Sequence, residues 1–286
     1  MYNFIKNILE NNFSEEDKLK MLQDVATKKV TAEELAKIVT YLKSKQAIKL
    51  DLPDSIDIVW TWWSWLDRIN TSTLTSLKLA SMWVKVAKHW NNASSGKFWS
   101  FDLIERLWYK IPTTTEEVLK EYEEKNIAFL YAKKFFPFMK EFAQARIAYG
   151  KPTIFNILWP LLCPANSNHQ MIGCSFEDKM ELMIETCKIL WKKRIMIVRW
   201  EDWLDEVTIT WKTKVYELKD WTIKDFYFTP DYFWFKEAKL DDILEKDIEK
   251  KVEIAKKIIA WEKVWAYSDL VNINVLAAYY LLWKNF

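Results

Sequence analysis

The sequence predicts an α/β protein: a small all-helical domain followed by a large α/β domain with a central, mostly parallel sheet flanked by helices. Residues 1–48 carry amphipathic patterns that begin at helix-capping residues. From residue 56 onward, short β-branched runs alternate with longer amphipathic stretches, an order typical of parallel strands joined by helices. The segment LDLPDS interrupts the first pattern, so we expect a helical domain at 1–52 and an α/β domain at 53–286.

The helical domain is expected to contain three helices, at 4–12, 14–29 and 32–45. Ser14 and Thr31 are suitable N-cap residues because a side-chain oxygen at that position accepts a hydrogen bond from the first turn. Glu16 and Asp17 follow Ser14 and place negative charge near the helix N-terminus.

The α/β domain is expected to follow in this order. We predict strands at 56–59, 84–89, 127–132 and 194–199, and helices at 72–82, 101–107, 116–125 and 179–190. We predict an antiparallel extension at 205–210, 213–220 and 222–228. A charged helix at 241–260, with a solvated face, and an apolar helix at 270–282 complete the chain.

Charge and cysteine content exclude several classes of protein. Lys and Arg number 42 against 40 Asp and Glu, a net charge of +2, which supplies no basic field for general nucleic-acid binding. Three cysteines without C-x-x-C spacing, and an N-terminus without a signal-peptide pattern, favour the cytoplasm. The apolar stretches at 154–165 and 270–283 are shorter than the roughly 18 residues of a membrane span.

Tryptophan and glycine occur in abnormal numbers. The chain has 18 Trp and 3 Gly, whereas average usage predicts roughly 20 glycines for this length. Trp60, Trp62, Trp63 and Trp65 crowd one loop, where the small size and positive φ of glycine are typical. We interpret these tryptophans as glycines encoded by a reassigned UGA codon. The alternative is a protein that is truly rich in tryptophan.

A glycine-rich loop follows the first predicted strand under this interpretation. Residues 57–73 then become DIVGTGGSGLDRINTST, a strand, a glycine loop and a helix start. Glycines let backbone N–H groups approach phosphate oxygens, and the helix N-terminus adds partial positive charge beside the Ser72 and Thr73 hydroxyls. The loop is therefore a candidate diphosphate site, with a purely structural turn as the alternative.

The segment after the second predicted strand carries further polar residues. Lys88 would stand at the sheet edge where ligands of open α/β sheets bind, and is a candidate phosphate clamp. His89 alone would be structural, but its polar neighbours favour a ligand pocket; these are Asn91, Ser94, Ser95 and Gly96.

Adjacent carboxylates follow the predicted strand at 194–199. Asp205 and Glu206 can hold Mg²⁺, which takes carboxylate and phosphate oxygens. The alternative is a solvated acidic turn that also includes Glu201 and Asp202. His169 is expected to be a loop residue, and no nucleophile–base arrangement is evident.

Together these segments resemble the anthranilate phosphoribosyltransferase family. The resemblance spans nearly the whole chain, and a Trp stands at most positions where the family has glycine. The matching motifs are the loop at 60–65 with NTST at 70–73, KHWN at 88–91, PFMK at 137–140, RIAYGKPTIFN at 146–156, LWPL at 158–161 with Pro164, and DE at 205–206.

The resemblance implies Mg²⁺-dependent transfer of phosphoribosyl from phosphoribosyl diphosphate (PRPP) to anthranilate, a step of tryptophan biosynthesis, by a homodimer formed through the helical domain. It also implies a helical excursion near 136–156 that joins this domain. Two Mg²⁺ would bind Ser72, Asp205 and Glu206. Catalysis would depend on Lys88, Arg146, Asp205 and Glu206, and anthranilate would contact Trp60, His89, Asn91 and Arg146. PRPP would contact Trp60, Trp63, Ser64, Arg68, Asn70, Thr71, Ser72, Thr73, Lys88, Asn91, Ser94, Ser95, Gly96 and Ser100.

Three residues depart from the family pattern. Ser64 replaces an acidic residue, Asn92 replaces an Arg and Phe136 replaces a His. Two alternatives therefore stay open: a nucleoside phosphorylase or phosphoribosyltransferase of the same fold with another acceptor, and a non-catalytic relative that binds nucleic acid.

Overall fold

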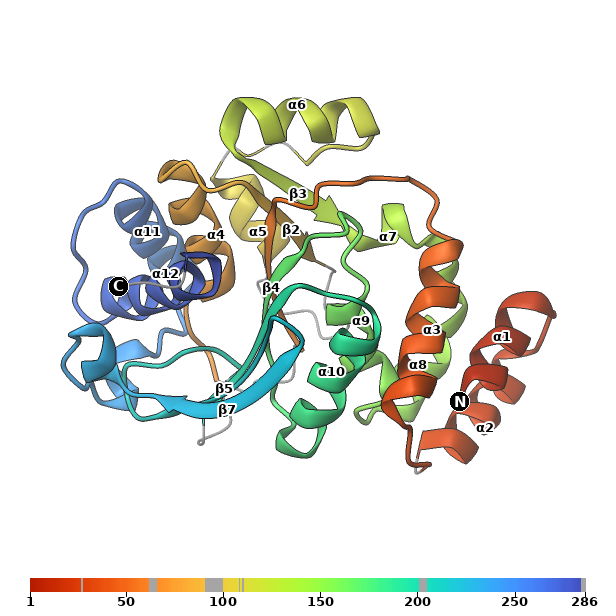
Figure 1. Ribbon diagram of the computed structural model, residues 1–286. Helices are drawn as coiled ribbons and strands as arrows, with labels where there is room; N and C mark the ends of the chain where they lie inside the picture. Colours follow the sequence, from red (N-terminus) through yellow and green to blue (C-terminus); the bar gives the residue numbers. More distant parts are fainter. Residues whose placement is uncertain are drawn as a thin grey trace.

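The computed structural model describes residues 1–26, 28–61, 66–90, 100–107, 109, 111–200 and 205–283. Its centre is a seven-stranded mixed sheet with helices on both sides (Figure 1). This architecture confirms the predicted fold class. Within these residues, no helix has the length and apolar character needed to cross a bilayer.

The sheet has the strand order β3-β2-β1-β4-β5-β6-β7. Strands β1 to β5 pair in parallel, and β6 and β7 pair antiparallel at one edge. The strands are β1 (Ile56–Trp60), β2 (Val86–Trp90), β3 (Ile127–Tyr131), β4 (His169–Gly173), β5 (Arg194–Trp200), β6 (Thr213–Lys219) and β7 (Thr222–Phe228).

Helices precede, connect and follow the strands. The first three are α1 (Tyr2–Glu10), α2 (Glu15–Ala26) and α3 (Ala32–Ser44). The connecting helices are α4 (Thr71–Ser81), α5 (Ser100–Arg106), α6 (Thr115–Lys125), α7 (Ala132–Phe135), η1 (Pro137–Phe142), α8 (Ala143–Tyr149), α9 (Ile154–Leu161) and α10 (Glu177–Ile189). The last are η2 (Pro230–Phe233), η3 (Leu240–Ile243), α11 (Ile248–Ile259) and α12 (Tyr267–Trp283).

Successive strand residues enter two hydrophobic cores. On one face, side chains such as Ile58 pack with α4 and α12. On the other, side chains such as Val59 join a cluster that continues through α9 and α10 into α1 and α3. Figure 1 shows α4, α11 and α12 on one side of the sheet and α1, α2, α3 and α8 together on the other. The α1–α3 unit therefore shares a continuous core with one face of the sheet.

The predicted caps form. The Thr31 hydroxyl accepts a hydrogen bond from Glu34 N at 3.2 Å, and the Ser14 hydroxyl accepts one from Asp17 N at 3.1 Å. These side chains satisfy N–H groups that the first helical turn leaves without backbone partners.

Three sequence expectations were wrong. His169 is not a loop residue: it begins β4, a central strand that the prediction missed, and pairs with Ile56 and Arg194. The segment HQMIG has weak β-propensity, but pairing on both sides outweighs propensity. Residues 205–210 are not a strand, and their backbone is instead bonded at Val207 by the Asn274 side chain. The charged helix begins at Ile248, because Asp247 accepts hydrogen bonds from the first turn.

Left-handed backbone conformations concentrate at tryptophan. Among the described residues, nine non-glycine residues have positive φ, and five of these are Trp83, Trp191, Trp221, Trp234 and Trp261, with φ between 58° and 67°. Trp83, Trp191 and Trp261 follow the last turns of α4, α10 and α11, where glycine is the common residue. Asp220 and Trp221 form a two-residue hairpin turn with positive φ at both positions, a geometry that favours Asp-Gly.

Candidate active site

The carboxyl ends of the parallel strands place the predicted functional segments at one edge of the sheet. In the strand register, Trp60 at the end of β1 is opposite Gly173 of β4, and Trp90 at the end of β2 is opposite Tyr131 of β3. The rings of Trp90 and Tyr131 stack with centroids 5.0 Å apart. This edge is where open α/β sheets bind ligands.

The N-terminus of α4 begins beside this edge. The Asn70 side chain caps the helix by accepting a hydrogen bond from Thr73 N at 3.2 Å. No acidic residue lies in the first turn, so the partial positive charge of the helix end is not neutralised there. Thr71, Ser72 and Thr73 follow the cap and are buried. The arrangement suits an anionic ligand.

Lys88 lies beneath the first turn of α4. Its Nζ donates hydrogen bonds to the Ile58 carbonyl at 2.6 Å and to Ser72 Oγ at 3.1 Å, and the residue is 2% exposed. Burial lowers the pKa of Lys88 to about 8, although the nearby Asp57 carboxylate opposes this shift. The sequence predicted Lys88 at the sheet edge, and the structure adds that its ammonium group lies below the first turn of α4, hydrogen-bonded to Ser72.

Asp205 and Glu206 share one guanidinium. Arg68 Nη2 donates to Asp205 Oδ1 at 3.0 Å, and Arg68 Nε donates to Glu206 Oε1 at 2.6 Å. Both carboxylates are buried, with 2% and 0% of their side chains exposed. Burial raises the pKa of Glu206, and the Arg68 charge opposes that rise. The pair is therefore not a solvated acidic turn.

One oxygen of this carboxylate pair is left over. Within the described part of the chain, Glu206 Oε2 is buried and makes no hydrogen bond of acceptable geometry, although the Thr71 hydroxyl is near enough to the carboxyl group to lower its pKa. A buried carboxylate oxygen without a donor is destabilising unless a cation or water satisfies it. Two carboxylates against one guanidinium also leave negative charge, so these residues fit Mg²⁺, a hard cation that prefers oxygen ligands.

Gly173 fixes where Asp205 lies. A Cβ at this position would stand 1.7 Å from the Asp205 carbonyl oxygen and 2.5 Å from Cε3 of Trp60. Only glycine therefore allows the backbone of residue 205 to approach the end of β4. The sequence analysis did not identify Gly173, since nothing in HQMIG indicates the contact.

His89 is held by acceptors on both ring nitrogens. Its Nδ1 lies 2.6 Å from Asp57 Oδ2, and its Nε2 lies 3.0 Å from the carbonyl of Trp159 in α9. Because both partners only accept, the ring is a charged imidazolium. Burial opposes that charge, but the Asp57 carboxylate outweighs burial and raises the pKa of His89 to about 10. Gln170 Nε2 also donates to Asp57 Oδ2, at 2.8 Å.

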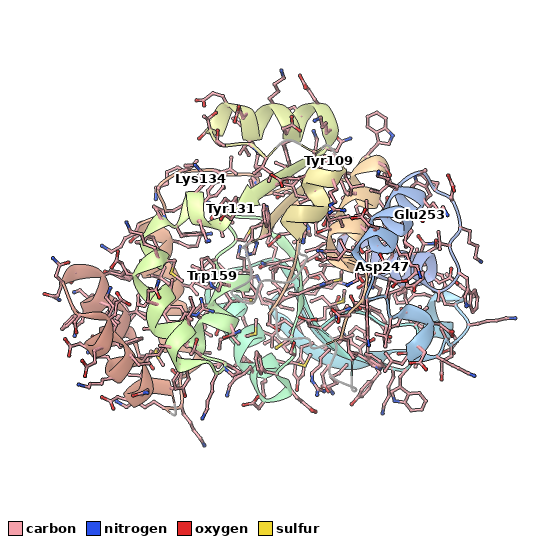
Figure 2. All side chains as sticks on the ribbon, turned by 180° about the vertical axis from the view of Figure 1, so that it is seen from behind. Tyr109, Tyr131, Lys134, Trp159, Asp247 and Glu253 are labelled. Carbon is pink, nitrogen blue, oxygen red and sulfur yellow. The ribbon has the colours of Figure 1, made fainter. Side chains whose placement is uncertain are left out.

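Arg146 is a cation in α8, on the side of the sheet where α1, α2 and α3 also lie. Its guanidinium carbon lies 5.2 Å from the centroid of the Phe155 ring, and burial lowers its pKa to about 10. Among the described residues it has no ion pair and no side-chain hydrogen bond. Figure 2 shows Trp159, from the same helix as Phe155, on the side of α7–α9, away from Asp247 and Glu253 of α11. A half-buried guanidinium of this kind suits a carboxylate ligand.

The structure thus brings together Ser72 with Lys88, and Arg68 with Asp205 and Glu206. It also reveals Asp57 and Gln170, which the sequence analysis missed, although a carboxylate within an apolar strand was a usable signal for Asp57. Ser100 begins α5, and its side chain is outside the described residues. Also outside them are the predicted Trp63, Ser64, Asn91, Ser94, Ser95 and Gly96, and the divergent Asn92.

Phe136, the third divergent residue, is 1% exposed. Its ring packs edge-to-face against Phe138, with centroids 6.0 Å apart. The side chain therefore belongs to the core between α7 and η1.

Comparison with known proteins gives consistent results. The family model "Glycosyl transferase family, a/b domain" matches residues 53–285. The chain is 33% identical over 278 residues to anthranilate phosphoribosyltransferase of Alkaliphilus metalliredigens, which covers 97% of this chain and 82% of that protein. It is 31% identical over 260 residues to the enzyme of the same name from Bacillus subtilis, covering 91% and 77% of the two chains.

Solved structures of proteins with this name superpose on the chain over nearly its whole length. Anthranilate phosphoribosyltransferase from Thermus thermophilus superposes with a TM-score of 0.90 at 26% identity, covering 99% of this chain and 85% of that one. The protein of this name from Saccharomyces cerevisiae, solved in complex with PRPP and Mg, has the same fold, with a TM-score of 0.81 at 22% identity, covering 98% and 81%.

Proposed function

Because the chain belongs to the anthranilate phosphoribosyltransferase family, we propose that it transfers phosphoribosyl from PRPP to anthranilate, giving N-(5-phosphoribosyl)anthranilate and diphosphate. The observation that carries the proposal is the grouping, at one sheet edge, of a positive helix end without acidic residues, the Lys88–Ser72 contact and the buried Asp205–Glu206 pair. These groups suit the charges of a diphosphate ester and its metal.

In the proposed reaction, the protein mainly stabilises the leaving diphosphate. Breaking the C1–O bond of PRPP places negative charge on the diphosphate and positive charge on the ribose. The first turn of α4 and the Lys88 ammonium, transmitted through Ser72, are preorganised to stabilise the former. We propose that PRPP also contacts Trp60, Trp63, Ser64, Arg68, Asn70, Thr71, Thr73, Asn91, Ser94, Ser95, Gly96 and Ser100.

We propose that Ser72, Asp205 and Glu206 hold two Mg²⁺. The unpartnered Oε2 of Glu206 supports this assignment, and the yeast protein of the same fold was solved with PRPP and Mg. Bound there, Mg²⁺ would neutralise charge that develops on the leaving group. The close approach of Gly173 fixes the backbone at Asp205, and Arg68 contacts both carboxylates.

The acceptor needs no protein nucleophile, because the aniline nitrogen of anthranilate is itself nucleophilic. Arg146 is proposed to bind the anthranilate carboxylate, with Trp60, His89 and Asn91 completing the site. Holding the amine against C1 supplies a proximity effect. Both His89 ring nitrogens are already bonded, so His89 would act through its position rather than by proton transfer.

We propose that the functional protein carries glycine where the printed sequence has tryptophan, through a reassigned UGA codon. Five left-handed tryptophans and the Asp220–Trp221 hairpin turn support this proposal. Trp83, Trp191 and Trp234 are also more than 75% exposed, which is unusual for an indole. The gene sequence tests the idea directly: UGG codons at these positions would refute it.

Loss of anthranilate fluorescence in the presence of PRPP and Mg²⁺ tests the activity. We expect turnover by a chain with glycine at all 18 tryptophan positions, and its disappearance in Asp205→Ala and Arg146→Ala. The printed chain is expected to be inactive, since indoles at 60, 62, 63 and 65 would fill a phosphate cradle. A folded glycine form without turnover would refute the proposed acceptor, and phosphate-dependent release of a base from a nucleoside would identify the alternative.

Assembly and location remain predictions that follow from the family. We propose a homodimer formed through a helical domain of residues 1–52 with the helices near 136–156, and a cytoplasmic location. Analytical ultracentrifugation of the full chain tests the dimer, and a monomer at micromolar concentration would contradict it.

A further inference from the structure

The Arg68 guanidinium lies on the two carboxylates to which the proposed function assigns Mg²⁺. Its Nε and Nη2 contact Glu206 and Asp205 at 2.6 and 3.0 Å. The Arg68 side chain is 10% exposed, so the contact is made away from bulk water. While the contact persists, the guanidinium occupies one lone-pair direction of each of these two oxygens and places its positive charge beside them.

The backbone at Asp67 and Arg68 is held by residues that follow much later in the chain. Arg68 forms an isolated antiparallel bridge with Leu244, and Glu245 N donates to the Asp67 carbonyl at 2.9 Å. Lys251 Nζ lies 3.8 Å from an Asp67 carboxylate oxygen. These contacts fix the start of the Arg68 side chain, so a change at the carboxylates must come from rotation of the side chain itself.

The charges of the three side chains indicate that the carboxylate pair can accept a further cation. One guanidinium neutralises one of two buried carboxylates, and Glu206 Oε2 stays without a hydrogen-bond partner in the described residues. A divalent cation could satisfy both charges, but like charges repel, so it cannot share the pair with Arg68 at short range without a large electrostatic penalty.

We propose that Arg68 is an internal counter-cation of the metal site: it occupies Asp205 and Glu206 in the metal-free protein, competes with Mg²⁺ and leaves the pair when the metal binds. This inference rests on the proposed function only for the identity of the metal. The released guanidinium remains beside the first turn of α4, where an anionic group arriving with the metal can accept its hydrogen bonds.

Metal binding without substrate tests this proposal. We would measure the Mg²⁺ dissociation constant by calorimetry, and the thermal midpoint with and without Mg²⁺, for the full-length glycine form, its Arg68→Gln variant and a control. Arg106→Gln is the matched control, because Arg106 is an arginine whose side chain and whose partner Glu249 are both exposed. We expect Arg68→Gln to bind Mg²⁺ at least tenfold more tightly, to unfold at a lower temperature without metal, and to regain stability with it.

An unchanged or weaker Mg²⁺ affinity in Arg68→Gln, or no binding by either form, would overturn the proposal. If Arg68→Gln does not fold without metal, Arg68→Lys decides. A lysine keeps the positive charge but has a shorter reach and lacks the planar, bidentate geometry of the guanidinium, so it should compete less well for the two carboxylates. The Mg²⁺ affinity of Arg68→Lys is therefore expected to exceed that of the parent, and equality would refute the competition. Turnover of anthranilate is scored separately, so a failed transferase assay with a shifted metal affinity refutes only the function, and the converse result refutes only this inference.

Discussion

The His89–Asp57 pair should make the stability of the protein depend on pH in a way that one substitution removes. The two side chains are 3% and 0% exposed and lie 2.6 Å apart. Replacing Asp57 with Asn keeps the shape of the residue but removes its charge. A buried ion pair that loses one partner typically loses about 3–5 kcal/mol. We therefore expect Asp57→Asn to lower the free energy of unfolding near neutral pH by about 3 kcal/mol, since the amide retains some hydrogen bonds.

The sign of the pH dependence follows from the direction of the shift. The pKa of His89 is raised from 6.5 to about 10 in the folded protein. The stabilisation that charged His89 gives the folded protein is therefore fully present below pH 6.5 and is lost as the pH rises toward 10. At about 1.4 kcal/mol per pKa unit, the rise of the His89 pKa from 6.5 to about 10 corresponds to about 5 kcal/mol in the free energy of unfolding, as an upper bound. The parent chain should lose most of this amount between pH 6.5 and 10, and Asp57→Asn should lose little of it.

Urea denaturation at pH 6.5, 8 and 9.5 measures this difference. The control is His169→Gln, which removes the other histidine. His169 is half-buried and is the first residue of β4, whereas His89 lies near the end of β2. The control should retain the decline with pH. Parallel stability profiles for the parent and Asp57→Asn would show that His89 is not charged in the folded protein, and would refute the argument.

Three further predictions concern the active site. Lys88→Met should lower kcat/KM about 100-fold by removing the charge beneath Ser72; in the parent, steady-state rates should fall above pH 8, where this ammonium deprotonates. Arg146→Gln should raise the KM for anthranilate about 10- to 100-fold without changing that for PRPP, as initial rates would show. Gly173→Ala should destabilise the fold by about 1–3 kcal/mol and abolish the Mg²⁺-dependent rise in the thermal midpoint, because its Cβ would collide with the Asp205 carbonyl.

Local signals were sufficient for most of the fold. The caps at Ser14 and Thr31 and the alternation of strands and helices after residue 56 predicted the helical start and the parallel sheet. They failed for β4, because a strand with neighbours on both sides is stabilised by pairing that its own residues do not reveal. They also failed for 205–210, where the hydrogen-bond partner Asn274 lies 67 residues away.

The candidate site was predictable where chemistry is concentrated in adjacent residues. The Asp205–Glu206 pair and the Lys88–His89 pair could be singled out because they lie at or after the ends of predicted strands, where ligands of open α/β sheets bind. The roles of Asp57, Gln170 and Gly173 could not be predicted, since each depends on a contact between strands that are distant in the sequence. Arg68 was expected to bind PRPP, and only the structure shows its contact with both carboxylates.

The adjacent residues Lys88 and His89 connect the two halves of the proposed reaction. Successive strand residues point to opposite faces of a sheet, so Lys88 reaches Ser72 in α4 while His89 reaches the Trp159 carbonyl in α9. Helix α9 also carries Phe155, which packs against Arg146. In the proposed reaction, the end of β2 would therefore support the diphosphate side through Lys88 and the anthranilate side through His89. Asp57 and the Ile58 carbonyl of β1 fix these two cations in turn, so the geometry between the two substrates is set by one pair of neighbouring strands.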